Sequence, residues 1–219
     1  MGEGQGRGQP PDSRFLRNDS ETNMNTQKLI RCFIALELPI DIQAALCDIM
    51  GQLKTTGADV KWVDPANIHL TLKFLGEIPE SDVLRVGLDM KSLKGKIKII
   101  ASGIGGLGAF PTLDRPKIIW AGLSQGADEI KGIYHEVERL TADISEEEKG
   151  REFSPHMTLG RVRSSKNLQQ LKEAIKQADI LQKGFEFNRL VLMKSTLTRE
   201  GAIYTEMNGI EFIRKELTK

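Results

Sequence analysis

Histidine and cysteine are both scarce in this sequence of 219 residues, and each scarcity narrows the possible functions. Only two cysteines are present, Cys32 and Cys47, so neither a disulfide framework nor a zinc site of several spaced cysteines is indicated. Both are expected to be buried or half-buried thiols in a reducing cytosol. Only three histidines are present, so any acid–base chemistry near neutral pH has few groups to use.

The chain also lacks a long apolar run and an excess of charge of either sign. No stretch approaches the roughly 18–20 apolar residues of a membrane-spanning helix, and the first residues lack the hydrophobic segment of a signal peptide. The 31 basic and 30 acidic residues leave a net charge of +1. A broad basic face that wraps duplex nucleic acid is therefore not indicated. We expect a cytoplasmic monomer with no membrane contact.

The pattern of the chain predicts one folded unit behind a disordered extension. Residues 1–27 are rich in glycine, glutamine, asparagine and charge, which predicts disorder. Residues 28–219 alternate strand-like runs with helical periodicity, which indicates an α+β domain. The glycine-rich residues 103–108 are interpreted as a connection between two strands. The expected strands lie within 30–36, 61–63, 69–75, 96–100, 116–123, 152–162, 185–197 and 202–213, and the expected helices within 42–53, 81–90, 124–140 and 168–178.

Two segments share the pattern His-x-Thr-Leu, namely 69–72 and 156–159. Both lie in strand-like stretches, and the first, 69–75, alternates strictly between polar and apolar residues. Residues i and i+2 of a strand project from the same face, so each segment should present one imidazole beside one hydroxyl. The order strand, helix, His-x-Thr strand, helix occurs twice. This repeat predicts two similar lobes whose His/Thr faces oppose each other across a cleft.

Two imidazoles and two hydroxyls in one cleft suit the cleavage of a phosphodiester. One imidazole can act as general base and the other as general acid, while the hydroxyls of Thr71 and Thr158 can donate to phosphate oxygens. No metal is needed, and the clustered carboxylates of two-metal hydrolases are missing. A single His-x-Thr is more often structural, but two of three histidines carry this frame. The third, His135, is expected on a solvated helix surface.

On these residues the chain resembles the 2H phosphoesterase superfamily, specifically the bacterial and archaeal RNA 2′,3′-cyclic phosphodiesterases long called 2′-5′ RNA ligases. The resemblance covers residues 30–213. It implies a bilobal α+β fold with two mostly antiparallel sheets and outer helices around a central cleft. It also implies hydrolysis of RNA 2′,3′-cyclic phosphate ends, or of small cyclic nucleotides, to a 2′-phosphate without a cofactor. The matching segments are 31–36 with Leu38-Pro39, Trp62-Val63, 67–76, 116–120, 153–161, and 192–197 with Tyr204.

The resemblance assigns roles that the residues alone leave open. It implies that His69 is the proton donor and His156 the proton acceptor, whereas the sequence pattern does not distinguish the two. Thr71 and Thr158 would bind the phosphate.

Two further residues have a role under the same resemblance. Arg161 follows the second His-x-Thr segment and would neutralise phosphate charge, although a solvated surface charge is the alternative. Phe74 would stack on a base, but its position on the strand fits the core equally well. Two other functions stay open. One is reversible 2′-5′ ligation of RNA fragments that resemble tRNA halves, and the other is an RNA- or nucleotide-binding module without catalysis.

Overall fold

Strands and helices alternate along the part of the chain that the computed structural model describes, which is residues 1–2, 28–145, 152–178, 183–199 and 201–214. Nearly all of the predicted disordered extension, residues 1–27, lies outside these described residues. The elements are β1 (Leu29–Leu36), α1 (Ile40–Lys54), β2 (Val60–Trp62), the 3₁₀ helix η1 (Pro65–Asn67), β3 (Leu70–Pro79), α2 (Glu80–Lys91), β4 (Ile100–Phe110), β5 (Ile118–Leu123), α3 (Ala127–Thr141), β6 (Met157–Val162), α4 (Leu168–Gln177), β7 (Gly184–Phe187), β8 (Arg189–Leu197) and β9 (Ala202–Glu211).

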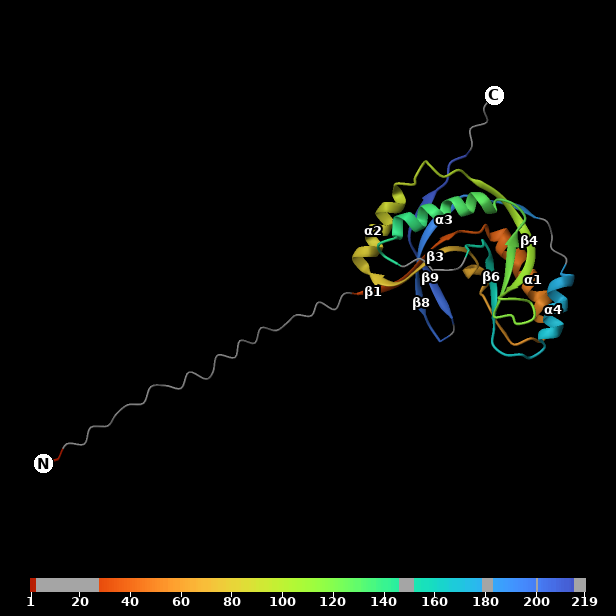
Figure 1. The fold of residues 1–219 in the computed structure, drawn as a ribbon, viewed down its shortest axis with the longest axis horizontal. Helices are drawn as coiled ribbons and strands as arrows, with labels where there is room; N and C mark the ends of the chain where they lie inside the picture. Colours follow the sequence, from red (N-terminus) through yellow and green to blue (C-terminus); the bar gives the residue numbers. More distant parts are fainter. Residues whose placement is uncertain (3–27, 146–151, 179–182, 200, 215–219) are drawn as a thin grey trace, which may run out of the picture.

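The strands form one curved sheet in the order β7-β4-β5-β6-β3-β1-β8-β9, with β2 beside β6. Its centre is the antiparallel contact between β3 and β6, which consists of a single paired position, Leu70 with Met157. In Figure 1, β1, β8 and β9 lie on one side of this contact and β4 on the other. The predicted bilobal α+β architecture is confirmed, and its two antiparallel sheets are continuous through this one pair.

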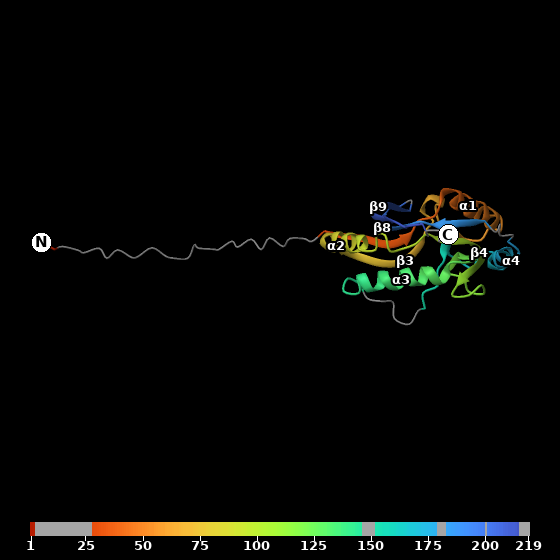
Figure 2. The same cartoon turned by 90° about the horizontal axis from the view of Figure 1, so that it is seen from above.

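The four α-helices cover the sheet in two pairs that mix the two halves of the sequence. Helix α2 packs against α3, and α3 against β3, while α1 packs against α4 at the other end of the molecule (Figure 2). Each pair therefore takes one helix from before β4 and one from after it, so the two lobes interlock. Among the described residues, no helix is long and apolar enough to span a membrane.

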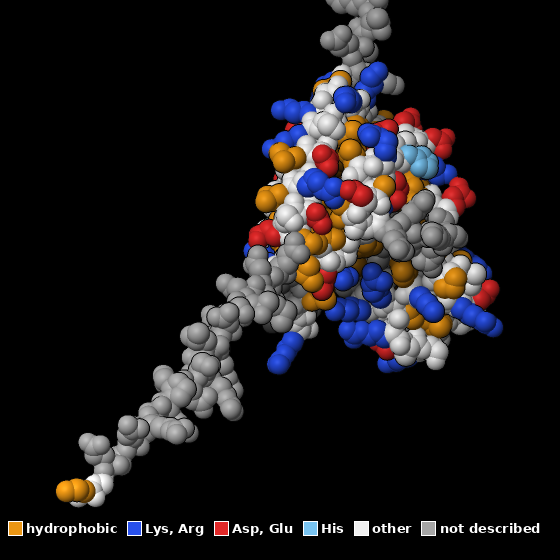
Figure 3. All heavy atoms as spheres, turned by 60° about the vertical axis from the view of Figure 1, so that its left-hand side comes forward, with side chains coloured by type: hydrophobic (Ala, Val, Ile, Leu, Met, Phe, Trp, Pro, Cys, Tyr) orange, Lys and Arg blue, Asp and Glu red, His pale blue; other side chains and the backbone are white. Residues whose placement is uncertain are grey.

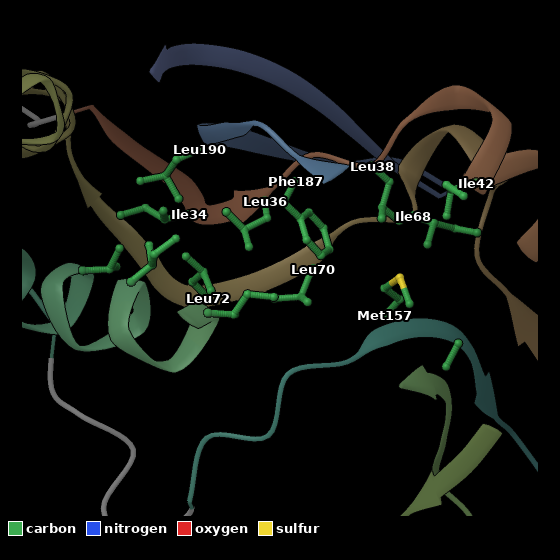
Figure 4. Close-up of a cluster of buried hydrophobic side chains, with 14 of the residues drawn as sticks. Ile34, Leu36, Leu38, Ile42, Ile68, Leu70, Leu72, Met157, Phe187 and Leu190 are labelled. Atoms are coloured by element: carbon green, nitrogen blue, oxygen red, sulfur yellow. The ribbon is translucent and has the colours of Figure 1, made fainter. Parts of the chain in front are cut away.

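A large apolar cluster fills the space between the sheet and the helices. Figure 4 shows Leu70, Leu72 and Met157 among its side chains. Leu70, Met157 and Leu159 are fully buried and Leu72 nearly so. The apolar residues of both His-x-Thr-Leu segments thus face the core, as the alternation predicted.

The glycine-rich stretch is the main error in the predicted elements. Residues 103–108 are not a connection, because they lie inside β4, which pairs with β5. Gly108 lies opposite Trp120, and a Cβ on Gly108 would overlap the indole ring. Glycine weakens the local strand signal but lets another group approach the backbone closely. Here that group is a tryptophan from the neighbouring strand, which the local pattern does not show.

Candidate active site

The β3–β6 contact sets the two His-x-Thr segments next to each other. Since Leu70 pairs with Met157, antiparallel order directs His69 towards Thr158 and Thr71 towards His156. Leu70 and Met157 point into the core, so their neighbours project from the opposite face of the sheet. We call this face, which carries these two histidines and two threonines, the site face. The four side chains are half-buried.

His69 is held by a backbone carbonyl and by two aromatic rings. Its Nδ1 lies 2.7 Å from the carbonyl oxygen of Asn67, and since a carbonyl only accepts, Nδ1 carries the proton. The imidazole stacks on Phe33 at 4.7 Å and meets Tyr204 edge-on at 5.3 Å. Burial lowers the pKa of His69 to about 4, and the Asn67 carbonyl offsets part of that effect. The free protein therefore has a neutral His69 at pH 7, with a lone pair on Nε2.

His156 has the same arrangement in the other lobe. Its Nδ1 lies 2.7 Å from the carbonyl oxygen of Ser154, which also stands two residues before the histidine. Phe110 meets the imidazole edge-on at 5.0 Å, and Trp120 lies 6.4 Å away. Burial lowers the pKa of His156 as well, again against the carbonyl bond. Both histidines thus have a protonated Nδ1 and an Nε2 free for proton transfer.

A β-bulge decides where Phe74 points. The register between β1 and β3 shifts so that Leu72 has no partner on β1. Side chains of a strand point alternately to its two faces, and one extra residue exchanges the faces for the residues that follow it. Phe74 then pairs with Phe33 and is 57% exposed, with the two rings 5.8 Å apart. Phe74 therefore lies on the site face and not in the core.

The same bulge corrects the expectation of strict alternation over residues 69–75. That pattern places Lys73 beside His69 and Thr71, whereas the structure turns Lys73 to the helix side of the sheet. There its Nζ lies 2.6 Å from Oε2 of Glu138 on α3, with both side chains largely buried. Lys73 thus joins β3 to α3 and lies away from the site face.

A second bulge, in β6, brings Arg161 to the site face. Thr158 pairs with Trp120 and Arg161 with Ile118, so Leu159 is the extra residue. Without it, Arg161 would point away from Thr158. Burial raises the pKa of Tyr204, and the positive charge of Arg161 opposes that rise. Arg161 is therefore within electrostatic reach of the tyrosine that touches His69.

Several neighbours of the two histidines stand far from them in the sequence, and the His-x-Thr spacing does not point to them. Phe33 and Tyr204 at His69, and Phe110 at His156, come from strands far away in sequence. Trp120 on β5 pairs with Thr158 and lies near His156. Only the fold brings these rings together, so no local spacing could identify them.

The remaining polar candidates lie as expected. His135 is exposed on α3. Cys32 is a buried free thiol whose pKa burial raises to about 11, and Cys47 is half-buried and free. Within the described ranges, no group of three His, Cys, Asp or Glu side chains is placed to hold a metal ion. On the face seen in Figure 3, several Lys and Arg side chains lie next to one another in the lower part, and others are spread over the upper part.

The sequence as a whole matches a known family over the region that contains both His-x-Thr segments. The family model described as LigT like Phosphoesterase matches residues 36–120 and 123–204. The chain belongs to the LigT-like phosphoesterase family. The resemblance inferred from the two segments is thereby confirmed.

Relatives of this LigT-like phosphoesterase share sequence over most of its length. It is 34% identical over 167 residues to the RNA 2′,3′-cyclic phosphodiesterase of Aeropyrum pernix, covering 76% of this chain and 94% of that protein. It is 36% identical over 182 residues to the protein of the same name from Aquifex aeolicus, covering 81% and 95%. Among solved structures, TT0787 of Thermus thermophilus matches with a TM-score of 0.68 at 23% identity, covering 85% of this chain and all of that one. Apo LigT of Escherichia coli matches with a TM-score of 0.67 at 20% identity, covering 85% and 99%. These structures support the same fold.

Proposed function

We propose that this LigT-like phosphoesterase hydrolyses the 2′,3′-cyclic phosphate end of RNA to a 2′-phosphate, without a metal. The observation that carries the proposal is the Leu70–Met157 pair, which directs two histidines and two threonines to one face. The names of the relatives from Aeropyrum pernix and Aquifex aeolicus support the same substrate.

The proposed reaction uses one imidazole as base and the other as acid. Nε2 of His156 takes a proton from water, whose oxygen attacks the phosphorus. The bond from phosphorus to the 3′ oxygen breaks, and Nε2 of His69 supplies the proton that makes this oxygen a hydroxyl. The phosphate stays on the 2′ oxygen. Hydroxyls of Thr71 and Thr158 donate to the non-bridging oxygens and hold the phosphorus in line.

Protonation of the acid depends on the substrate in this scheme. Burial keeps both histidines neutral in the free protein and lowers the pKa of His69 to about 4. An anionic phosphate beside an imidazole raises its pKa, because it stabilises the charged form. Arg161 neutralises the rest of the phosphate charge, and Phe74 offers an exposed ring for the terminal base.

We propose further that residues 28–219 act as one bilobal domain, as a monomer, in the cytoplasm. The apolar cluster shared by elements of both lobes supports a single folding unit. The free thiols Cys32 and Cys47 fit a reducing compartment.

The test is to incubate the protein with an RNA oligonucleotide that ends in a 2′,3′-cyclic phosphate, in the presence of EDTA, and to identify the product by ³¹P NMR. We expect a 2′-phosphomonoester at an undiminished rate. A 3′-phosphate, or activity that EDTA abolishes and a metal restores, would contradict the proposed chemistry. Joining of a second RNA through its 5′-hydroxyl would indicate the ligase alternative, and tight binding without turnover would indicate the binding module.

A further inference from the structure

Arg31 is a second exposed arginine on the site face. Along β1, Phe33 and Ala35 pack with Val191 in an apolar cluster separate from the main core, and Phe33 stacks on His69. Arg31 lies two residues before Phe33 on the same strand, so its side chain leaves the same face. It is exposed, at the end of β1 away from the β3–β6 contact.

The side chains of β1 and β3 form successive rows on the site face. Ala35 pairs with Thr71, Phe33 with Phe74, and Arg31 with Glu77. The row of Phe33 and Phe74 therefore lies between Thr71, which belongs to the proposed reaction centre, and Arg31. One row is two residues along β1, or about 7 Å. A nucleoside stacked on Phe74 would thus have the reaction centre on one side and Arg31 on the other.

Arg31 and Arg161 act on the same tyrosine. Burial raises the pKa of Tyr204, and the charges of Arg161 and Arg31 both oppose that rise, so both guanidinium groups act on the ring that touches His69. Arg161 belongs to β6 and Arg31 to β1, so each lobe contributes one positive charge.

Neither guanidinium is neutralised within the described part of the chain. Glu77 faces Arg31 across the strands, but the two form no ion pair, and Arg161 has none either. Arg189 of β8 is the contrast, because its guanidinium binds three carboxylates, those of Glu37, Glu206 and Glu211. An arginine on this sheet can thus be fully paired, whereas no described side chain forms an ion pair with Arg31, which leaves its guanidinium available for an anion.

We propose that Arg31 binds a second phosphate of the RNA, the one that joins the terminal nucleoside to its 5′ neighbour. The substrate class is then an RNA strand of at least two nucleotides, and a 2′,3′-cyclic mononucleotide is a poor substitute. The proposal rests on the proposed function. A cyclic phosphate carries one negative charge, and Arg161 with the two threonines suffices to bind it. The guanidinium of Arg31 lies beyond the exposed ring of Phe74, where the next phosphate of a single strand would come if the terminal base stacks on that ring.

The experiment compares kcat/KM for a dinucleotide that ends in a 2′,3′-cyclic phosphate with kcat/KM for the 2′,3′-cyclic mononucleotide of the same base. The variants are Arg31→Gln, Arg31→Lys and the control Arg139→Gln on α3, whose side chain lies on the helix side of the molecule. The wild type should prefer the dinucleotide about tenfold or more, the factor expected for one hydrogen bond to a charged group. Arg31→Gln should lower this preference about tenfold, Arg31→Lys should keep part of it, and Arg139→Gln should keep all of it.

The ratio also separates the two proposals. No turnover of either substrate by the wild type would contradict the proposed function itself. Turnover of both with equal kcat/KM, or an equal preference in the wild type and Arg31→Gln, would overturn the second phosphate site and leave the phosphodiesterase intact. Since each variant is compared on two substrates, a partial loss of folded protein does not change the ratio.

Discussion

The side-chain amide of Asn67 donates to the backbone carbonyl of Ala202, 2.9 Å away and 135 positions later in the chain. The backbone carbonyl of the same asparagine accepts from Nδ1 of His69 at 2.7 Å. Asn67 therefore connects the β8–β9 hairpin to the orientation of the imidazole. In the other lobe, Ser154 holds His156 through its carbonyl alone among the described contacts.

Replacing Asn67 with alanine should lower activity through His69. Asn67→Ala removes the bond to Ala202 but keeps the carbonyl that holds the ring, so the imidazole should lose its fixed orientation. Misplacement of a catalytic group by about 1 Å can cost about 100-fold, and we expect kcat on the cyclic-ended RNA to fall between about 10- and 100-fold with a smaller change in KM. Gln43→Ala is the matched control, because the Gln43 amide donates to the neighbouring Ile68 carbonyl at 3.4 Å. Equal effects of the two variants would show that Asn67 has no special role.

The buried neutral His69 should make stability depend on pH. Its pKa falls from 6.5 to about 4 on folding, so between these values the unfolded chain binds more protons than the folded one. The free energy of unfolding is therefore highest above pH 6.5 and decreases as the pH falls towards 4, by up to about 3 kcal/mol. Urea denaturation at pH 7.5 and 4.5 measures the difference. His69→Gln should reduce it, whereas replacing the exposed His135 with glutamine should not. A pH effect that is the same in all three proteins would contradict the assignment.

Substrate binding should reverse the order of protonation if His69 is the acid. In the free protein the pKa of His69 is lowered to about 4, so its imidazole is neutral at pH 7. To act as the acid in the substrate complex, the same imidazole has to be protonated. An NMR titration of the histidine Cε1–H signals, assigned with His69→Gln and His156→Gln, follows both groups with and without a nucleoside 2′-phosphate. The pKa of His69 should rise from about 4 on binding. A rise confined to His156 would exchange the two roles.

The ion pair between Lys73 and Glu138 should be important for stability because it is buried. The two side chains are only 5% and 17% exposed, and removal of one partner leaves an uncompensated charge, which costs about 3–5 kcal/mol. Lys73→Met should destabilise by an amount of this order, and Lys73→Met with Glu138→Leu should recover most of it. The exposed pair Lys28–Glu80, 65% and 49% exposed, is the control, and Lys28→Ala should change stability little. Similar effects of Lys73→Met and Lys28→Ala in thermal or urea unfolding would be evidence against this role.

The parts of the fold that depend on local alternation could be predicted from the sequence. The residues of 69–72 and 156–159 lie on the faces that a period of two predicts, because the extra residue of each bulge, Leu72 or Leu159, comes only at the last position of its segment. Lys73, Phe74 and Arg161 lie just beyond an extra residue, Leu72 or Leu159, and there alternation gives the wrong face. A bulge depends on the partner strand, which the local sequence does not specify.

Contacts between residues far apart in the chain could not be predicted from the sequence either. Asn67 and Ala202, Phe33 and His69, and Gly108 and Trp120 meet only after the sheet has formed. The glycines of β4 lack the β-branched and aromatic side chains that are typical of a strand. Gly108 is needed because the indole ring of Trp120 on β5 occupies the space that a side chain would take.

The most direct test of the two-histidine site is the rate of cyclic-phosphate hydrolysis by His69→Ala and His156→Ala, measured on the same RNA with EDTA present and compared with His135→Ala. Positioned acid and base groups each contribute about 100- to 10,000-fold. We predict a loss of this size in each of the first two variants, and wild-type activity in His135→Ala, whose ring lies exposed on α3. Retention of activity within about tenfold by both His69→Ala and His156→Ala would contradict this prediction.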